Sequence, residues 1–509
     1  MIRRNKPTIA LAVFVILVGA TLDAHGMEVV RVNDGDAFPL IAEVVPRRLL
    51  ETDQPGYGYN GSIPGPVLRV RRGATIRVPF TNNLPEPTTV HWHGLRHDIR
   101  FDGVPGISQE PVKPGETFVY ELHFRDAGVF WYHPHVREDR QQDMGLFGMI
   151  IVEDYNEDAS ENDMAVREEV LIINDTLIHR TRPVPFFPGE IVDHALMGRF
   201  GNIVTVNGDS RVTFEADAGE TVRFHLLNVA SARPYNVVID GAPMKLVGSD
   251  LGPVSRQQMI DGVLIAPAER YTVDVHFPDT GEYTILDRTP MGDWEIGSVR
   301  TGGTTGGRHD AESFYQQREN HVIDRSIVQS ALDRQPDAVL EFDVTTGMMM
   351  DHGGMDHGSM DHGGMNHGEP GSPGTFDGIE WYDDMPMTNA ASTNRNTRWI
   401  FREPTQNREN EEIHLSARTG SYVLLRLVNR DDSPHPMHHP IHLHGQRFVV
   451  IREDGNENEN LAWKDTVLVR AGSTVDILVE VDEPGRWMLH CHIPEHMEAG
   501  MVTFLNVGG

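Results

Sequence analysis

A histidine pair with one intervening residue occurs four times along this chain of 509 residues. Successive side chains on a β-strand point to opposite faces, so each pair would present two imidazoles on one face of a strand. Eight neutral imidazoles without a carboxylate suit copper better than calcium or magnesium, and zinc does not need so many. The pattern therefore predicts a fold of short strands that gathers the pairs around three copper ions, which would take three, three and two imidazoles. The pairs are His91 with His93, His133 with His135, His442 with His444, and His490 with His492.

Cys491, the only cysteine of the chain, lies between the two histidines of the fourth pair. On a strand it would point away from them, so that one short segment can contribute to two metal sites. His496 and Met501 follow five and ten residues after the cysteine, and His439 can supply a further imidazole. A thiolate, two imidazoles and a distant thioether form the ligand set of a blue-copper electron-transfer site. The alternative is a buried structural cysteine among surface histidines, which the recurrence of the pairs disfavours.

The start of the chain has the composition of an export signal. Arg3, Arg4 and Lys6 precede an apolar run over residues 9–18, and small residues follow the run. This run is too short for a permanent membrane anchor, although an uncleaved anchoring helix is the alternative. We therefore predict a signal peptide over residues 1–24, no stable membrane insertion, and a periplasmic or secreted protein. An exported chain with one cysteine cannot form an internal disulfide, which leaves a metal-bound thiolate as the natural role of that cysteine.

The formal net charge of the chain is −31 at pH 7. Such an excess of acidic residues argues against nucleic acid and against anionic membrane surfaces as partners, because like charges repel. The charge favours solubility and attracts cations, and it carries no information about the fold.

A strand pattern that runs from a turn glycine through alternating residues to an asparagine occurs three times. The glycine and the asparagine are nine residues apart in residues 73–82, 219–228 and 420–429. Short alternating strands, frequent glycine, proline and asparagine turns, and the lack of a long amphipathic helix indicate antiparallel β-sandwiches. We therefore predict an all-β protein with three related β-sandwich domains. Their predicted ranges are 28–155, 165–330 and 337–509.

The histidine pairs fall in the first and third predicted domains, and the middle domain contains none. Neither outer domain alone holds the complete set of eight imidazoles. The two outer domains must therefore meet, with the early pairs facing the late pairs, while the middle domain serves as a spacer.

The motifs around these residues resemble those of the three-domain multicopper oxidases, a family that includes laccases, bilirubin oxidases and bacterial cuprous oxidases. The chain carries HWHG from His91, HPH from His133, HPIHLHG from His439 and HCHIPEHMEAGM from His490, as well as NGSIPGP over residues 60–66. Some details resemble the copper-resistance branch of the family. The resemblance covers nearly the whole chain after the predicted signal peptide, and it implies that the β-sandwiches are cupredoxin-like Greek-key domains.

The resemblance also implies four copper ions, of which one is type 1, one is type 2 and two are type 3. It implies an enzyme that takes electrons one at a time from Cu(I) or small phenolic compounds, passes them through Cys491 and its flanking histidines, and reduces O2 to two waters. A role in copper tolerance and a monomeric state are further expectations. The alternatives are a protein that only binds or buffers copper, and a copper nitrite reductase, a class that works without four such pairs. Carried over by position, the type 1 ligands are His439, Cys491, His496 and Met501, the type 2 ligands are His91 and His442, and the type 3 ligands are His93, His133 and His492 for one ion and His135, His444 and His490 for the other.

Delivery of protons to the three-copper cluster requires a carboxylate, and the resemblance assigns this role to Asp102, nine residues after His93. The alternative role of Asp102 is that of a turn residue before Gly103. Relatives such as the cuprous oxidases usually place a glutamate directly after the second type 1 histidine, where this chain has Met497. Glu498 follows at the next position and is the second candidate for proton delivery.

Residues 348–367 form a low-complexity segment in which methionine and histidine recur with a period of five. Their glycine content favours a loop. Thioether sulfur is a soft ligand that suits Cu(I), and the position of the segment resembles that of the methionine-rich insert of cuprous oxidases. We therefore predict an accessory Cu(I) site near the type 1 copper, with a passive linker or a site for another metal as alternatives. The candidate ligands are Met350, His352, Met355, His357, Met360, His362, Met365 and His367.

Overall fold

The structure is a computed structural model that describes six ranges of the chain. Most of the predicted signal peptide lies outside the described residues, and so does the whole methionine–histidine segment over residues 348–367. Among the residues that are described, no helix has the length and apolar character needed to cross a membrane. The described ranges are 20–22, 27–50, 52–154, 166–303, 311–347 and 377–509.

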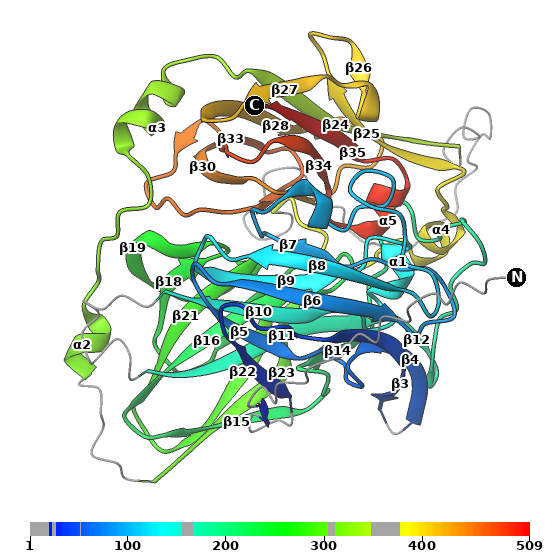
Figure 1. Cartoon of the computed structure of the whole chain (residues 1–509). Coiled ribbons are helices and arrows are strands. Elements are labelled where there is room, and N and C mark those ends of the chain that lie inside the picture. The colour runs from blue at the N-terminus through cyan, green and yellow to red at the C-terminus, as the bar shows by residue number, and fades with distance from the viewer. Residues whose placement is uncertain (1–19, 23–26, 51, 155–165, 304–310, 348–376) are drawn as a thin grey trace, which may run out of the picture.

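β-Strands dominate the described chain, as the sequence predicts, and they form three pairs of facing sheets that follow one another along the chain (Figure 1). The first pair consists of a six-stranded sheet and a four-stranded sheet. In spatial order, the six-stranded sheet contains β1 (Ala20–Leu22), β2 (Glu28–Val32), β5 (Val67–Arg71), β10 (Gly148–Glu153), β9 (Gly128–His133) and β7 (His91–His93), and the four-stranded sheet contains β4 (Thr52–Tyr59), β3 (Leu40–Leu49), β6 (Thr75–Asn82) and β8 (Thr117–His123).

The middle pair consists of a six-stranded sheet and a five-stranded sheet, with a two-stranded ribbon beside them. The six-stranded sheet contains β14 (Ile203–Val206), β11 (Arg167–Thr176), β16 (Glu220–Asn228), β21 (Arg270–Phe277), β18 (Met244–Ser249) and β19 (Gly252–Ile260). The five-stranded sheet contains β15 (Val212–Asp217), β23 (Gly292–Gly302), β22 (Gly281–Thr289), β17 (Tyr235–Ile239) and β20 (Val263–Ile265), and the ribbon pairs β12 (Ile178–His179) with β13 (Arg182–Pro183).

The last pair consists of a seven-stranded sheet and a five-stranded sheet. The seven-stranded sheet contains β26 (Arg408–Glu409), β25 (Thr397–Glu403), β24 (Ala338–Thr346), β28 (Ser421–Asn429), β33 (Thr474–Val481), β30 (Arg447–Glu453) and β31 (Asn456–Glu457). The five-stranded sheet contains β27 (Leu415–Arg418), β35 (Val502–Gly508), β34 (Gly485–Cys491), β29 (His439–Leu443) and β32 (Thr466–Val469).

The helices of the described chain are short and lie in the connections between strands. None of them has the long amphipathic pattern of a core helix, in agreement with the sequence. They are η1 (Ile99–Phe101), α1 (Glu138–Gln141), α2 (Ala311–Tyr315), α3 (Arg325–Leu332), α4 (Pro386–Ala391), η2 (Asn410–Glu412) and α5 (Pro494–Glu498).

The repeated segments of the sequence form the homologous strands β6, β16 and β28, one in each sheet pair. The glycine before each strand has a positive φ of +82° to +86°, which a residue with a Cβ rarely adopts. The asparagine at the end is buried in all three, as Asn82, Asn228 and Asn429. Each amide group donates to two backbone carbonyls at 2.7–3.0 Å and so closes the loop that follows. The spacing of nine residues is therefore the distance from the glycine turn before the strand to the asparagine that closes the loop after it. The same arrangement occurs in all three sandwiches.

The middle sandwich contacts both of its neighbours through the guanidinium of Arg270, which is 0% exposed. Arg270 Nε donates to the carbonyl of Val129 in the first sandwich at 2.8 Å. Its Nη1 donates to Asp465 Oδ1 in the last sandwich at 2.7 Å, and Nη2 donates to the other carboxylate oxygen. The ion pair between Arg270 and Asp465 links the middle sandwich to the last, and the bond to Val129 links Arg270 to the first. One buried arginine thus joins all three sandwiches.

Replacing Arg270 by methionine should strongly destabilise the folded chain, because the Asp465 carboxylate would stay buried with its charge uncompensated. We expect the free energy of unfolding, measured by urea titration, to fall by about 3–5 kcal/mol. The matched control is Arg300→Met, which removes an ion pair to Glu215 whose side chains are 59% and 61% exposed. That change should cost less than about 1 kcal/mol. Equal effects of the two substitutions would contradict the role assigned to Arg270.

Candidate metal centres

The four histidine pairs converge where the edge strand β7 of the first sandwich faces strands β29 and β34 of the last. In the β7–β9 ladder, His91 lies opposite His133, and in the β29–β34 ladder His442 lies opposite His490. Strand pairing therefore places the two histidine pairs of the first sandwich side by side, and it does the same for the two pairs of the last sandwich. All eight side chains are buried, with exposed fractions of 0–6%.

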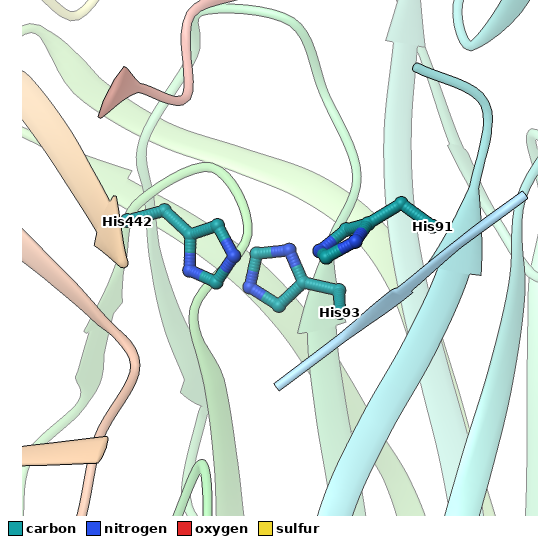
Figure 2. A group of neighbouring side chains, drawn as sticks. All are labelled: His91, His93 and His442. Atoms are coloured by element: carbon teal, nitrogen blue, oxygen red, sulfur yellow. The ribbon is translucent and has the colours of Figure 1, made fainter. Parts of the chain in front are cut away.

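The ring nitrogens form groups of three that are close enough to share a metal ion. Figure 2 shows His91 and His93, which come from β7, and His442, which reaches them from β29 on the opposite side. The ring centroids of His93 and His442 are 3.6 Å apart. Within each group, the candidate ligand atoms lie within 4.8 Å of one another. The groups are His91, His93 and His442; His93, His133 and His492; His135, His444 and His490; His91 and His444 with the carboxylate of Asp102; and, apart from these, His439, Cys491 and His496.

Unpartnered nitrogen atoms show that these rings fit metal ions. Buried polar atoms in folded proteins nearly always have a hydrogen-bond partner. Here the Nε2 atoms of His444 and His490 face each other at 3.0 Å, and the nitrogens that point inward from the other rings have no partner at all. The unpartnered donors are all imidazole nitrogens, which suit copper. The unpartnered atoms are Nε2 of His91, His133, His135 and His442, Nδ1 of His93, and both ring nitrogens of His492.

Hydrogen bonds to the outward-facing nitrogens determine which ring atom points inward. The Nδ1–H of His91 donates to the carbonyl of Asp102 at 2.7 Å, and that of His442 donates to the carbonyl of Asp465 at 2.9 Å. His93 is reversed, because its Nε2–H donates to Asp465 Oδ1 at 2.9 Å. Such partners orient a ligating imidazole and select its tautomer. The structure therefore directs Nε2 of His91 and His442, and Nδ1 of His93, into the centre.

Burial also keeps these imidazoles in the neutral form that binds metals. Desolvation, followed by the proximity of the other imidazoles, lowers their pKa values because a charged ring would be buried without compensation. Metal binding requires the neutral ring, so the site is ready for a cation over a wide pH range. The pKa lies below its usual range for His93, His133, His135, His442, His444, His490 and His492.

Asp102 lies at the end of η1 and is 1% exposed. Its Oδ2 accepts a hydrogen bond from the Nδ1–H of His444 at 3.0 Å, so the carboxylate contacts histidines of both outer sandwiches. Burial alone would raise the pKa of Asp102, but the neighbouring imidazole of His91 lowers it below the usual value. Gly103 has a φ of +83°, and a Cβ there would lie 2.0 Å from the carbonyl of Val90. The turn before Gly103 and the contact with the histidines are therefore compatible roles of the same aspartate.

Asp465 has a comparable position but is absent from the sequence-based predictions. It contacts His93 and His442, and the ion pair with Arg270 holds it in place. The guanidinium and the nearby imidazole outweigh burial and keep the pKa of Asp465 well below its usual value. Its only signal in the sequence is an acidic residue followed by the apolar strand β32, which is a weak indication of function.

Cys491 ends strand β34 and faces away from the eight imidazoles, as the alternation along a strand predicts. Its Sγ lies 3.4 Å from His439 Nδ1 and 3.6 Å from His496 Nδ1. Met501 is 0% exposed, and its carbonyl accepts a hydrogen bond from the Cys491 N–H at 3.2 Å. The ring of Trp399 packs against His496 with a centroid distance of 4.2 Å. Burial raises the pKa of the Cys491 thiol, so a bound metal is needed to hold the sulfur as a thiolate.

Helices α1 and α5 each carry a further carboxylate, and the sequence analysis named only the one in α5, Glu498. Glu498 is half-buried at the end of α5, and burial raises its pKa to about 7. Glu138 begins α1 and is 1% exposed. Its carboxylate lies 3.4 Å from His133 Nδ1 and 3.8 Å from His492 Nε2, and burial raises its pKa well above the usual value. The position of Glu138, three residues after the second histidine motif, is the signal that could have identified it.

Comparisons with known proteins agree with this arrangement. Sequence models described as multicopper oxidase match residues 42–157, 151–312 and 381–508. A multicopper oxidase of Mycobacterium tuberculosis is 27% identical over 475 residues, which cover 88% of this chain and 82% of that protein. Laccase-2 of Trametes versicolor is 26% identical over 475 residues, with coverages of 87% and 84%.

Solved structures extend the similarity to the fold. The crystal structure of a multicopper oxidase from Pseudomonas thermotolerans has a TM-score of 0.68 and 26% sequence identity, and the match covers 94% of this chain and 100% of that one. A multicopper oxidase from Campylobacter jejuni has a TM-score of 0.69 at 22% identity, covering 96% and 98%. These similarities confirm the predicted class of three cupredoxin-like Greek-key β-sandwiches.

Copper should stabilise the folded chain, because the ligand atoms converge only after folding. We expect saturating copper to raise the midpoint of thermal unfolding by roughly 5–10 °C relative to metal-free protein. Differential scanning calorimetry measures the shift. Mg²⁺ at the same concentration is the control, because it prefers oxygen ligands and should leave the midpoint unchanged. An equal shift with both ions, or none with copper, would show that the histidine groups do not form a copper site.

Proposed function

Because the chain belongs to the multicopper oxidase family, we propose that it couples four one-electron oxidations of a small reducing substrate to the reduction of O2 to two waters. The observation that carries the proposal is the run of residues 490–492. In it, the cysteine of one candidate centre is joined through the backbone to one histidine from each of two other groups. An electron delivered beside Cys491 therefore has a short covalent route to both groups.

We propose that the chain holds four copper ions in the arrangement that its motifs imply. When bound, copper supplies one-electron redox chemistry and the binding of O2. The unpartnered ring nitrogens and the buried thiol support this proposal. The proposed ligands are His439, Cys491, His496 and Met501 for type 1; His91 and His442 for type 2; and His93, His133 and His492, together with His135, His444 and His490, for the two type 3 ions.

The protein itself orients the ligands and moves protons. Asp465 and Asp102 accept hydrogen bonds from His93 and His444, and so direct the opposite ring nitrogens into the centre. We propose that Asp102 also passes protons toward the reduced oxygen, since its carboxylate lies at the edge of the histidine groups. Glu498 is the proposed second source, because its pKa of about 7 allows it to hold a proton near neutral pH.

We propose Cu(I) and small phenolic compounds as the electron donors, with copper tolerance as the biological role. The methionine–histidine segment supports Cu(I), and the similarity to a laccase supports phenols. We also propose that the protein is exported to the periplasm or the exterior and that it is a monomer. The composition of residues 1–24 supports the export.

Copper-loaded protein should consume O2 with either 2,6-dimethoxyphenol or Cu(I), at four one-electron donors per O2. In Cys491→Ser, the hydroxyl is a poor substitute for a thiolate, so we expect one copper fewer per chain and loss of the blue absorption. Turnover should fall by more than the roughly 10–100-fold that loss of an outer-shell partner causes. An oxygen electrode and a copper assay measure these effects. Full copper uptake without O2 consumption with either donor would instead indicate a protein that only buffers copper.

Deleting residues 348–367 should lower the rate of Cu(I) oxidation and raise that of 2,6-dimethoxyphenol, if the segment collects Cu(I) and restricts access of larger donors. Soft thioether ligands attract Cu(I), so their removal should weaken the supply of this donor. The matched control is a segment of the same length with leucine for methionine and glutamine for histidine. This control variant should lose the effect on Cu(I) oxidation, but its segment keeps the same length and similar side-chain volume. Unchanged rates for both donors in the deletion variant would identify the segment as a passive linker.

A further inference from the structure

A cavity of about 640 Å³ lies between the tip of the β22–β23 hairpin, strand β14 and the segment that precedes α4. This volume suits one small aromatic molecule with its substituents. Trp381 and Ile296 are buried in its wall, and Trp294 stands at its rim. Most of its lining comes from the middle sandwich, with Leu50 from the first sandwich and Trp381 and Tyr382 from the last, and none of the proposed copper ligands lines it.

Exposed apolar side chains gather around this opening. Of the nine large apolar side chains that are exposed in the described part of the chain, four line the cavity. Trp294 is 59% exposed, Tyr382 50%, Met291 49% and Leu50 42%. Contiguous exposed apolar surface marks a binding site more often than scattered residues do. Two aromatic rings and a thioether are also well suited to contact another aromatic ring.

The guanidinium of Arg233 lines the cavity but is already engaged by the protein. Its Nε donates to Asp175 Oδ2 at 2.9 Å, Nη2 donates to the carbonyl of Gly201 at 2.7 Å, and Nη1 donates to the carbonyl of Trp381 at 2.5 Å. Its charge is balanced by Asp175. The inner part of the cavity therefore favours a neutral ligand over an anion.

Asp287 is the acceptor that this cavity offers to a ligand. Its side chain is 5% exposed, and Oδ1 accepts a hydrogen bond from the N–H of Asn236 at 2.9 Å. No described residue donates to the other carboxylate oxygen, Oδ2. Burial raises the pKa of Asp287 to about 6, against the opposing effects of the Asn236 hydrogen bond and Arg233, so the group is mostly ionised at neutral pH. A ligand with a hydroxyl group would satisfy the free oxygen.

His438 connects the cavity wall to the candidate centre at Cys491. Its Nδ1 accepts a hydrogen bond from the N–H of Glu380 at 3.1 Å, and Glu380 directly precedes Trp381 in the wall. On its other side, His438 is bonded through the backbone to His439, which faces the cysteine sulfur.

The second nitrogen of His438 makes a parallel connection. Its Nε2–H donates to the carbonyl of Ala232 at 3.0 Å, and Ala232 directly precedes Arg233, which also lines the cavity. Because Glu380 must donate to Nδ1, the ring is the neutral tautomer with its proton on Nε2, which matches both contacts. Two residues that directly precede cavity-lining residues, Glu380 and Ala232, thus hydrogen-bond to His438, which is next to a proposed type 1 ligand.

We propose that this cavity binds a neutral aromatic donor that carries a hydroxyl group, such as a methoxyphenol, with its ring against Trp294 and Trp381 and its hydroxyl on Asp287. The proposal rests on the oxidase function proposed above, and it adds the class of electron donor and the cavity in which the donor binds. Each bound donor loses one electron and its hydroxyl proton and leaves as a phenoxyl radical. The electron leaves through His438 and His439, and the proton passes to Asp287 and then to solvent. Four such events supply the four electrons that O2 needs, and four protons complete two waters.

Binding without turnover tests the cavity directly. Copper-loaded protein that is fully reduced and kept free of O2 cannot oxidise a donor, so titration calorimetry with 2,6-dimethoxyphenol reports binding alone. Trp294→Ala should weaken this binding by about tenfold, because an exposed ring contributes the stacking contact. Tyr315→Ala is the matched control, since Tyr315 is 53% exposed and lies outside the cavity. Its affinity should equal that of the wild type.

Turnover in air separates this proposal from the function on which it rests. Trp294→Ala should raise the KM for 2,6-dimethoxyphenol by the same factor while leaving kcat and the KM for Cu(I) unchanged. Asp287→Asn removes the proposed proton acceptor, so it should lower kcat for the phenol as well as raise its KM, and it should leave Cu(I) oxidation unchanged. If the wild type oxidises the phenol but Trp294→Ala behaves like Tyr315→Ala, the cavity is not the donor site and the oxidase function stands. If the wild type oxidises neither donor, the proposed function fails, and the calorimetric comparison alone decides whether the cavity binds phenols.

Discussion

The buried ion pair between Arg270 and Asp465 holds the three sandwiches together where the histidine pairs meet. A buried pair of charges is stable only when hydrogen bonds satisfy the remaining polar atoms. Arg270 also donates to the carbonyl of Val129, and Asp465 also accepts from His93 and from the hydroxyl of Thr466. The middle sandwich contributes no histidine, yet its arginine determines where the carboxylate that orients His93 and His442 lies. It therefore does more than separate the outer two sandwiches.

Much of this arrangement could be predicted from local patterns in the chain. Strand alternation alone places Cys491 opposite to its flanking histidines, and the incomplete ligand sets require the outer sandwiches to meet. The repeated asparagine spacing indicates three related sandwiches, and the structure shows why, since Asn82 and its two counterparts each close a loop with paired hydrogen bonds.

Residues that act through contacts between distant segments could not be found in this way. Asp465 and Arg270 are 195 positions apart, and nothing in the local pattern of either one reveals the other. Glu138 follows a recognisable motif, but its importance depends on complete burial beside His133, which a sequence pattern does not report. The cavity at the tip of the β22–β23 hairpin is lined by residues of all three sandwiches, so it exists only in the folded molecule.

The division of ligands between the two ends of the chain has a consequence for biosynthesis. Histidines of the first sandwich are translated long before those that follow His439, and the group formed by His93, His133 and His492 needs both. A truncated product or a chain still leaving the ribosome therefore lacks part of this group. The group can therefore form only after the last strands have been made and have docked against the first sandwich.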